Sequence, residues 1–300
     1  MEFVSTITKD GVRLKGLLYR TKSDKCCVFI PGFAGNPIDN DFIDILCSTL
    51  IKHGYSALCA LNRGSFQLYT STIPGKNEKP KKIGSCVENI SDSSFDLDAW
   101  YSKILQLGFK DIILIGHCIG CNKIVNYLAH KEDLNNLKHV VLLSPLNMRA
   151  WLTNKNSFQN IMKAKEAEFD KQTGLIKCGF SYKTPDSIDD MLNNPIYMNL
   201  PNIYMLNSDS ANYSDYKSIK KPITVIFGEE EHVSQTIQQN FITNAHYPDQ
   251  TKCFIIPNAN HCYEGQEQKL ANTIVLSLCK KQQDFLYLLN ENIKKNIRHS

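Results

Sequence analysis

The 300-residue sequence lacks any apolar run of the roughly 20 residues that a membrane-spanning helix needs. It also lacks a strong excess of one charge, because 34 Lys and Arg residues against 30 Asp and Glu residues give a net charge of +4. So small a balance does not favour a nucleic-acid partner. The opening residues MEFVSTITKD contain neither a basic segment nor an apolar one, so we expect no secretory signal and a cytoplasmic location.

Regular cysteine spacing is missing as well. The 11 cysteines are an odd number without a repeating interval, so we expect most of them to be reduced and buried. Cys118 and Cys121 form a Cys-x-x-Cys pair, but no second pair follows at the spacing of a zinc finger. We therefore expect neither a metal nor another cofactor.

What the sequence does contain is an alternation of short apolar runs with amphipathic stretches. Residues 3–8 and 12–19 flank Asp10-Gly11, which is typical of a β-hairpin. Residues 26–30 are apolar throughout, as expected for a buried central strand. Further strands are expected at residues 56–61, 112–115, 139–143, 222–227 and 252–256, and helices at residues 42–53, 91–107, 121–130, 234–246 and 266–279. This alternation predicts an α/β fold with a mostly parallel central sheet flanked by helices.

The alternation is interrupted at residues 146–220, where Asn, Ser and Tyr are frequent and one helix is expected at residues 158–170. We interpret this segment as an insertion that covers the carboxyl edge of the sheet as a lid. The alternative is a small second domain without a catalytic role. The expected organisation is a core in two parts, residues 1–145 and 221–280, with the lid insertion at 146–220 and an amphipathic C-terminal helix at 281–300.

Residues 111–120, DIILIGHCIG, and their continuation to His130 place a strand, a sharp turn and a helix in direct succession, with Ile124, Val125 and Leu128 on one face of the helix. The turn from Gly116 to Gly120 has the form G-x-nucleophile-x-G, with Cys118 where serine is usual. Glycines are expected at both ends because a side chain would clash in so tight a turn. The motif resembles the nucleophile elbow of the α/β-hydrolase superfamily, and its cysteine variant is similar to dienelactone hydrolases and cysteine-type acyltransferases. The resemblance implies the α/β-hydrolase fold.

The resemblance also assigns a nucleophile and a base. Cys118 is the expected nucleophile, and the N-terminus of the following helix is expected to favour its thiolate. His261 stands in the loop after the last expected strand, where the superfamily places its histidine, and is the expected base. His232 is its competitor, since it stands beside the expected acid.

The expected acid lies in a run of three glutamates. The superfamily's typical turn here is Gly-x-x-Asp, and Gly228 to Glu231 matches it with glutamate in place of aspartate. Glu231 is therefore expected to hold the imidazole in one tautomer and to stabilise the imidazolium. Its neighbours Glu229 and Glu230 leave the register of this turn open.

The resemblance further implies an oxyanion hole made of two backbone N–H groups. One belongs to Ile119, directly after the nucleophile, and the other to Phe33, in the loop after residues 26–30. Pro31-Gly32 stands where the superfamily usually has His-Gly. Proline lacks an N–H, but the expected donor lies further on, and Gly35-Asn36 is similar to the rest of that loop.

Two basic features allow both a functional and a structural interpretation. Arg63 follows an expected strand and is a candidate for substrate binding, or else it braces loops through carboxylates. Residues 71–84 are expected to form a loop. Its lysines either contact a phosphate-bearing donor or acidic carrier, or are solvated: Lys76, Lys79, Lys81 and Lys82.

Together these features predict an enzyme that forms an S-acyl intermediate on Cys118. Thiolate attack on an ordinary oxygen ester makes a higher-energy thioester, so a cysteine suits activated esters, lactones and thioesters. The expected partner is a small-molecule acyl substrate, free or delivered as a thioester on coenzyme A or a carrier protein. Hydrolysis by water and transfer to an amine or alcohol both stay open. So do a non-catalytic binding protein and a redox pair of Cys118 with Cys121.

Overall fold

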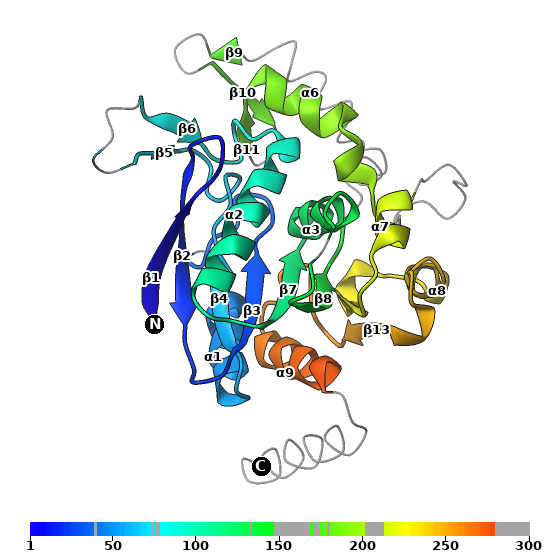
Figure 1. Cartoon of the computed structure of the whole chain (residues 1–300). Helices are drawn as coiled ribbons and strands as arrows, with labels where there is room; N and C mark the ends of the chain where they lie inside the picture. Colours follow the sequence, from blue (N-terminus) through cyan, green and yellow to red (C-terminus); the bar gives the residue numbers. More distant parts are fainter. Residues whose placement is uncertain are drawn as a thin grey trace.

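The computed structural model describes residues 1–38, 41–73, 75, 79–132, 134–146, 169–170, 174–178, 181–201 and 213–279. A central sheet of eight strands has the order β1-β2-β4-β3-β7-β8-β12-β13. Its strands are β1 (Glu2–Ile7), β2 (Arg13–Tyr19), β3 (Lys25–Ile30), β4 (Ser56–Ala60), β7 (Asp111–His117), β8 (Leu137–Leu143), β12 (Ile223–Gly228) and β13 (Thr251–Ile256). Neighbours from β4 to β13 run parallel, whereas β1 and β2 join antiparallel. The expected mostly parallel sheet is confirmed (Figure 1).

Helices cover both faces of this sheet because its central strands are apolar on both sides. In β7, Ile112 and Leu114 face one core, and Ile113 and Ile115 face the other. The first core is covered by α2 (Ser93–Gln106), which follows the 3-10 turn η1 (Ile90–Asp92), by α3 (Ile119–Ala129) and by α8 (Gln235–Thr243). The second is covered by α1 (Asp41–Lys52) and α9 (Glu267–Leu278), which contact each other. Each core helix and strand expected from the sequence is present, with its ends displaced by a few residues.

The expectation of a loop at residues 71–84 is wrong in part. Strand β6 (Lys81–Ile83) pairs antiparallel with β5 (Tyr69–Ser71) in a two-stranded sheet. The pairing is made by backbone hydrogen bonds, and side chains along β6 are polar and exposed except for buried Ile83. So short a strand, with a single buried side chain, has no recognisable period in the sequence.

The insertion contains a second small sheet and several short helices. Its described elements are β9 (Phe169–Asp170), β10 (Leu175–Cys178), β11 (Ser181–Lys183), α6 (Pro185–Asn193), η2 (Pro195–Met198) and α7 (Ser214–Ser218). The helix expected at residues 158–170 lies mostly outside the described residues, and its last two residues are strand β9, which pairs with β10. The C-terminal helix expected at residues 281–300 lies outside the described residues altogether. Figure 1 shows β9, β10 and β11 beyond the end of the central sheet at which β3 and β7 finish.

The later part of the insertion packs against α3. Both η2 and α7 contact α3. The side-chain amide of Asn122 on α3 donates to the Ile196 carbonyl and to Asn199 Oδ1, each at 3.1 Å. The Asn199 amide donates back to the Asn122 carbonyl at 3.1 Å, and both side chains are buried. This reciprocal bonding fixes the insertion to the helix that follows Cys118.

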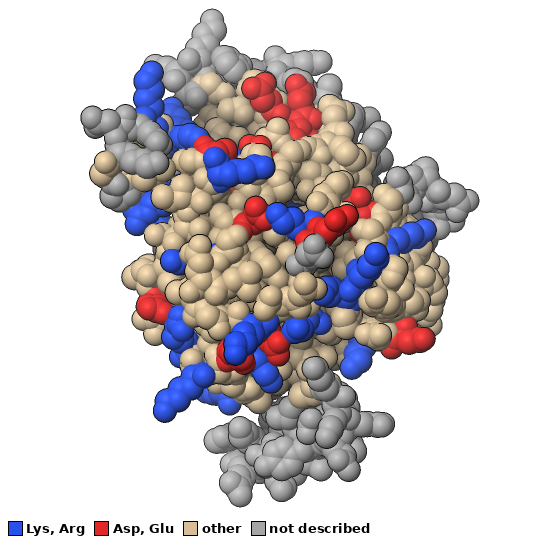
Figure 2. All heavy atoms as spheres, viewed as in Figure 1, with Lys and Arg blue, Asp and Glu red and all other residues tan. Residues whose placement is uncertain are grey.

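The surface shows no segregation of charge on the face in Figure 2, where basic and acidic side chains are interspersed. Among the helices that the structure describes, none combines the length and the apolar character that a membrane span requires.

Candidate active site

Cys118 lies in a strained turn between β7 and α3. Its backbone has φ 54° and ψ −127°, a conformation that L-residues rarely adopt. A side chain at Gly120 would bring its Cβ within 2.3 Å of the Ile30 carbonyl oxygen, and one at Gly116 within 2.8 Å of the Cys121 nitrogen. The predicted need for glycine at both positions is confirmed. The turn leaves Cys118 half-exposed at the carboxyl end of a central strand.

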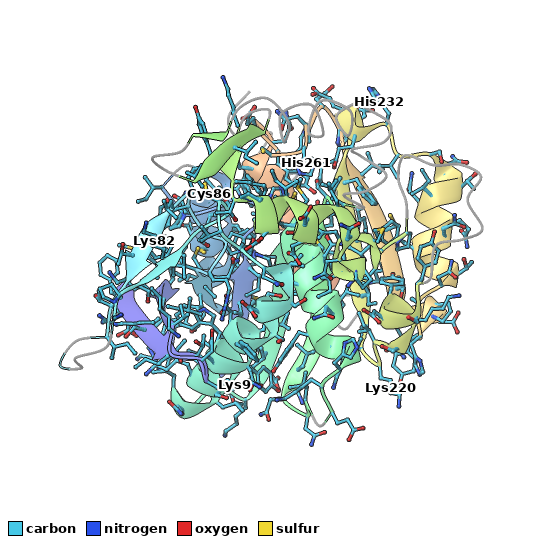
Figure 3. The ribbon with its side chains drawn as sticks, turned by 90° about the horizontal axis from the view of Figure 1, so that it is seen from above. Lys9, Lys82, Cys86, Lys220, His232 and His261 are labelled. Atoms are coloured by element: carbon cyan, nitrogen blue, oxygen red, sulfur yellow. The ribbon has the colours of Figure 1, made fainter. Side chains whose placement is uncertain are left out.

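His261 joins Cys118 to Glu231. Its Nδ1 donates to Glu231 Oε1 at 2.9 Å, and the same imidazole interacts electrostatically with the side chain of Cys118. The three residues come from the loops after β7, β12 and β13, so the predicted convergence at one sheet edge is present. In Figure 3, His261 lies nearer the centre of this end of the molecule than His232, and His232 is exposed. His261 is therefore the histidine that faces both partners.

Charge at this site favours a protonated His261. Burial lowers the pKa of His261, but the interactions with Cys118 and then with Glu231 outweigh it, so the pKa is raised well above its ordinary value of 6.5. The His261 side chain is 37% exposed, so solvent moderates this effect. A histidine placed between a nucleophile and a carboxylate has the position of a catalytic base.

Glu231 is the glutamate of the run that turns inward. Its carboxylate accepts from His261, from the Gly228 N–H at 2.8 Å and from the Ser144 hydroxyl at 2.6 Å. Burial raises the pKa of Glu231, but these hydrogen bonds, that of His261 first, bring it below its ordinary value. Glu229 instead accepts from the Asn258 N–H, and Glu230 is exposed. The 3-10 turn η3 (Glu229–Glu231) therefore selects Glu231.

Two residues that the sequence did not single out support Glu231. Ser144 is fully buried after β8 with φ 45°, and its Oγ lies 2.8 Å from the hydroxyl of buried Tyr263. That hydroxyl in turn donates to the Ile226 carbonyl at 2.8 Å, so its own proton is committed there. The position of Ser144 at the carboxyl end of an expected strand is the one signal in the sequence that could have indicated it.

His117 supports His261 from the other side. Its Nε2 donates to the His261 backbone carbonyl at 2.9 Å, and the two rings lie 5.1 Å apart between centroids. Burial, helped by the charge of His261, lowers the pKa of His117 to about 4. His117 is therefore neutral near pH 7 and keeps a fixed tautomer that holds the His261 loop.

We expect the loss of the Ser144 hydroxyl to weaken catalysis without unfolding the protein. Ser144→Gly removes the hydroxyl and suits the φ of 45°, so kcat for an activated ester is expected to fall about tenfold with little change in KM. The Ser144 hydrogen bond helps to lower the pKa of Glu231, so its loss raises that pKa, and the acid limb of the kcat/KM profile, which requires an ionised Glu231, is expected to move to higher pH. Ser277→Ala, which removes a buried hydroxyl from α9, is the matched control. An unchanged kcat and pH profile would contradict the role of Ser144.

The segments expected to form the oxyanion hole lie against Cys118. Ile119 is the first residue of α3, and a first helical N–H has no acceptor within its own helix. A side chain at Gly32 would place its Cβ 2.8 Å from the Cys118 Cβ, so the loop that leads to Phe33 runs directly beside the sulfur-bearing residue. The assignment of these two N–H groups to an oxyanion hole stays a prediction.

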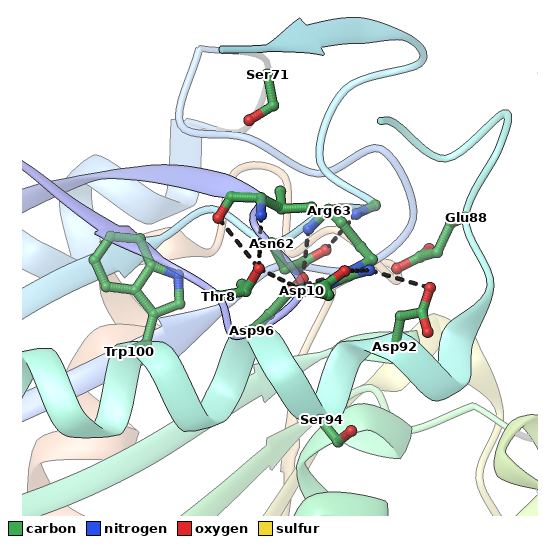
Figure 4. Close-up of polar contacts among 12 residues, drawn as sticks. Thr8, Asp10, Asn62, Arg63, Ser71, Glu88, Asp92, Ser94, Asp96 and Trp100 are labelled. Atoms are coloured by element: carbon green, nitrogen blue, oxygen red, sulfur yellow. Dashed lines mark hydrogen bonds and ion pairs between the residues drawn. The ribbon is translucent and has the colours of Figure 1, made fainter. Parts of the chain in front are cut away.

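The structure supports the bracing interpretation of Arg63 over substrate binding. Its guanidinium contacts Asp96 at 2.9 Å and both Asp10 and Asp92 at 3.1 Å, and the residue is 5% exposed (Figure 4). These carboxylates belong to the turn before β2, to η1 and to α2, so Arg63 ties three segments together. A cavity of about 310 Å³ adjoins this cluster, and neither Cys118 nor His261 lines it.

Cys121 occupies a different environment from Cys118. It is fully buried, and its Sγ donates to the carbonyls of Gly116 at 3.3 Å and Leu143 at 3.4 Å. Burial raises the pKa of the Cys121 thiol well above its ordinary value. This geometry disfavours the redox interpretation. No three His, Cys, Asp or Glu side chains of the described part of the chain are grouped to hold a metal ion.

No protein-family model matches the sequence, and no curated protein matches it. Solved structures match along nearly the whole chain. Est1E from Butyrivibrio proteoclasticus superposes with a TM-score of 0.60 at 16% identity, over 95% of this chain and 98% of that one. For the alpha/beta hydrolase GrgF from Penicillium sp. sh18 the TM-score is 0.62 at 14% identity, over 92% and 97%. For monoglyceride lipase from Saccharomyces cerevisiae it is 0.60 at 15%, over 90% and 92%. These likenesses show that the chain has the α/β-hydrolase fold.

Proposed function

We propose that the chain is a cysteine-dependent hydrolase that forms an S-acyl-enzyme on Cys118. The observation that carries the proposal is the position of His261, whose Nδ1 donates to the Glu231 carboxylate at 2.9 Å and whose ring interacts with Cys118 strongly enough to raise the pKa of His261. A nucleophile beside a base that an acid orients is the arrangement required for covalent acyl transfer.

The first half of the reaction acylates the enzyme. His261 takes the thiol proton, and the Cys118 sulfur forms a bond to the substrate carbonyl carbon. The carbonyl oxygen becomes an oxyanion that accepts hydrogen bonds from the N–H groups of Ile119 and Phe33. As the carbonyl re-forms, the bond to the leaving group breaks, and the imidazolium returns its proton to that group.

The second half releases the acid and restores the thiol. His261 removes a proton from water, and the resulting hydroxide attacks the thioester carbon. The bond between that carbon and sulfur then breaks, the carboxylic acid leaves, and Cys118 regains a proton from the imidazolium. Glu231 orients His261 in both halves and stabilises the imidazolium that forms in each.

The substrate class follows from the nucleophile. Because a thioester lies above an oxygen ester in free energy, acylation of Cys118 is favourable from activated donors: aryl or enol esters, lactones and thioesters. The structural neighbours named as an esterase (Pf2001) and a monoglyceride lipase support carboxylic ester chemistry over amide chemistry. The thioester donors in this class include small molecules and carrier-bound acyl groups.

The proposal predicts a trapped acyl group on Cys118. Mixing the full chain with p-nitrophenyl acetate or an acetyl thioester at low temperature and reading its intact mass is expected to show one added acetyl group, located on Cys118 by peptide mapping. A chase in buffer is expected to release acetate. Preferential formation of an amide with an added amine would instead assign acyl transfer, and the absence of any adduct on Cys118 would overturn the proposal.

A further inference from the structure

A buried ion pair joins α3 to the segment that precedes η1. Lys123 Nζ lies 2.5 Å from Glu88 Oε1, and the two side chains are 0% and 1% exposed. Desolvating two charges offsets much of their attraction, so apolar side chains of similar volume often stabilise a core as well or better. Stability of the core is therefore a weak reason for two charged side chains at this place, and the contacts that Lys123 makes besides Glu88 bear on their role.

Lys123 fixes the orientation of the Asn62 side chain. Its Nζ donates to Asn62 Oδ1 at 3.0 Å, and the Gly64 N–H donates to the same oxygen at 2.9 Å. Both partners are donors, so this end of the amide has to be the oxygen. The amide NH2 group then points to the Pro31 carbonyl, to which it donates at 3.1 Å (Asn62 and Glu88 are labelled in Figure 4).

Asn62 and its turn hold the loop on both sides of Phe33. Ahead of Phe33, the Asn62 amide bonds to Pro31; after it, the Ala34 N–H donates to the Gly64 carbonyl at 3.1 Å. The phenyl face of Phe33 also lies 4.7 Å from Lys183 Nζ of β11. The backbone that enters this loop passes close to α3, because a Cβ at Gly120 would lie 2.3 Å from the Ile30 carbonyl oxygen and 3.0 Å from that of Pro31.

We propose that Lys123, paired with Glu88, is a positioning residue for the oxyanion hole. It acts through Asn62 and Pro31 to keep the Phe33 N–H at the place where negative charge develops, and it does not itself touch the substrate. Lys123 lies one helical turn after Ile119 on α3. The same helix therefore carries the Ile119 N–H and the cation that positions the Phe33 N–H. The inference rests on the proposed function and names a further residue of the same site.

Acylation and alkylation of Cys118 distinguish this role from a merely structural one. Acylation passes through an oxyanion and needs the Phe33 N–H in place, whereas alkylation by iodoacetamide displaces iodide and forms no oxyanion. Removal of one oxyanion-hole donor typically costs 10²- to 10³-fold in rate, so a displaced donor is expected to cost about 10- to 100-fold. The ratio of the two rates therefore reports on the oxyanion hole itself.

The decisive variant is the double replacement Lys123→Met with Glu88→Gln, which leaves no unpaired buried charge. Its acylation by p-nitrophenyl acetate is expected to fall about 10- to 100-fold, with alkylation by iodoacetamide within about twofold of the natural chain. Asn62→Asp is a second route, since it keeps acceptors for Lys123 and Gly64 but loses the donor to Pro31. It is expected to lower the same ratio, measured below its thermal unfolding transition.

Lys131→Met is the matched control, because it removes a lysine from an exposed pair with Asp98 just after α3. Both of its rates are expected to be unchanged. An unchanged ratio in the double variant and in Asn62→Asp, or a parallel fall of both rates, would overturn the role of Lys123 while leaving the proposed function intact. A natural chain that is alkylated on Cys118 but never acylated would overturn the proposed function and this inference with it.

Discussion

Replacing Cys118 by alanine is expected to lower turnover of an activated ester by at least about 10⁴-fold. The reason is that the sulfur forms the covalent intermediate, and no other partly exposed cysteine of the described residues lies in the turn between β7 and α3. The remaining oxyanion donors can still polarise a bound carbonyl, which sets the residual rate. The measurement is initial-rate hydrolysis of p-nitrophenyl acetate, corrected for the uncatalysed reaction.

Cys121→Ser is the control for this first prediction. Its side chain is buried against two carbonyl oxygens, and serine retains a donor of similar size, so hydrolysis is expected to stay within about threefold of the natural chain. A redox protein would need both cysteines, so the Cys121→Ser variant would lose its activity as completely as Cys118→Ala. Retention of more than about 1% of the rate in Cys118→Ala would contradict the covalent mechanism.

The nucleophile and base could be inferred from the sequence because their signals are local. The elbow needs a strand, two glycines and a helix in succession within residues 111–130, and His261 stands in the loop after the last expected strand. The acid could be placed only within a run of three glutamates, since each of them fits a loop after a strand. What selects Glu231 is the return bond from the Gly228 N–H and the approach of Ser144 from another strand. That contact depends on the sheet order, which no local pattern contains.

The rest of the site could not be predicted because it depends on tertiary burial. The apolar residues after the elbow indicate a helix with one buried face. The insertion packs against α3, however, and nearly all of that helix is buried, so the polar residues Asn122 and Lys123 must find partners inside the protein. Arg63 shows the same effect, because its carboxylate partners come from segments up to 53 residues away in the chain.

His261→Gln is expected to lower kcat by about 10³-fold or more, because glutamine can neither take the thiol proton nor return it to the leaving group. The same change is expected to alter how stability depends on pH. The pKa of His261 is raised above 6.5, so its contribution is fully present below pH 6.5 and is lost as pH rises through the raised value. The pKa of Glu231 is lowered from 4.5, so its contribution is present above pH 4.5 and is lost as pH falls through the lowered value.

The stability that the Glu231–His261 pair contributes is therefore fully present only over a limited pH range. The natural chain is expected to exceed His261→Gln in thermal unfolding temperature most clearly between about pH 4.5 and 6.5, with the difference shrinking at both extremes. The measurement is the unfolding temperature of both proteins across this range. His130→Gln, which replaces an exposed histidine at the end of α3, is the surface control for the same measurement. A flat difference for His261→Gln would show that Glu231 and His261 are not charged together in the folded protein, and the general-base role of His261 would lose its electrostatic support.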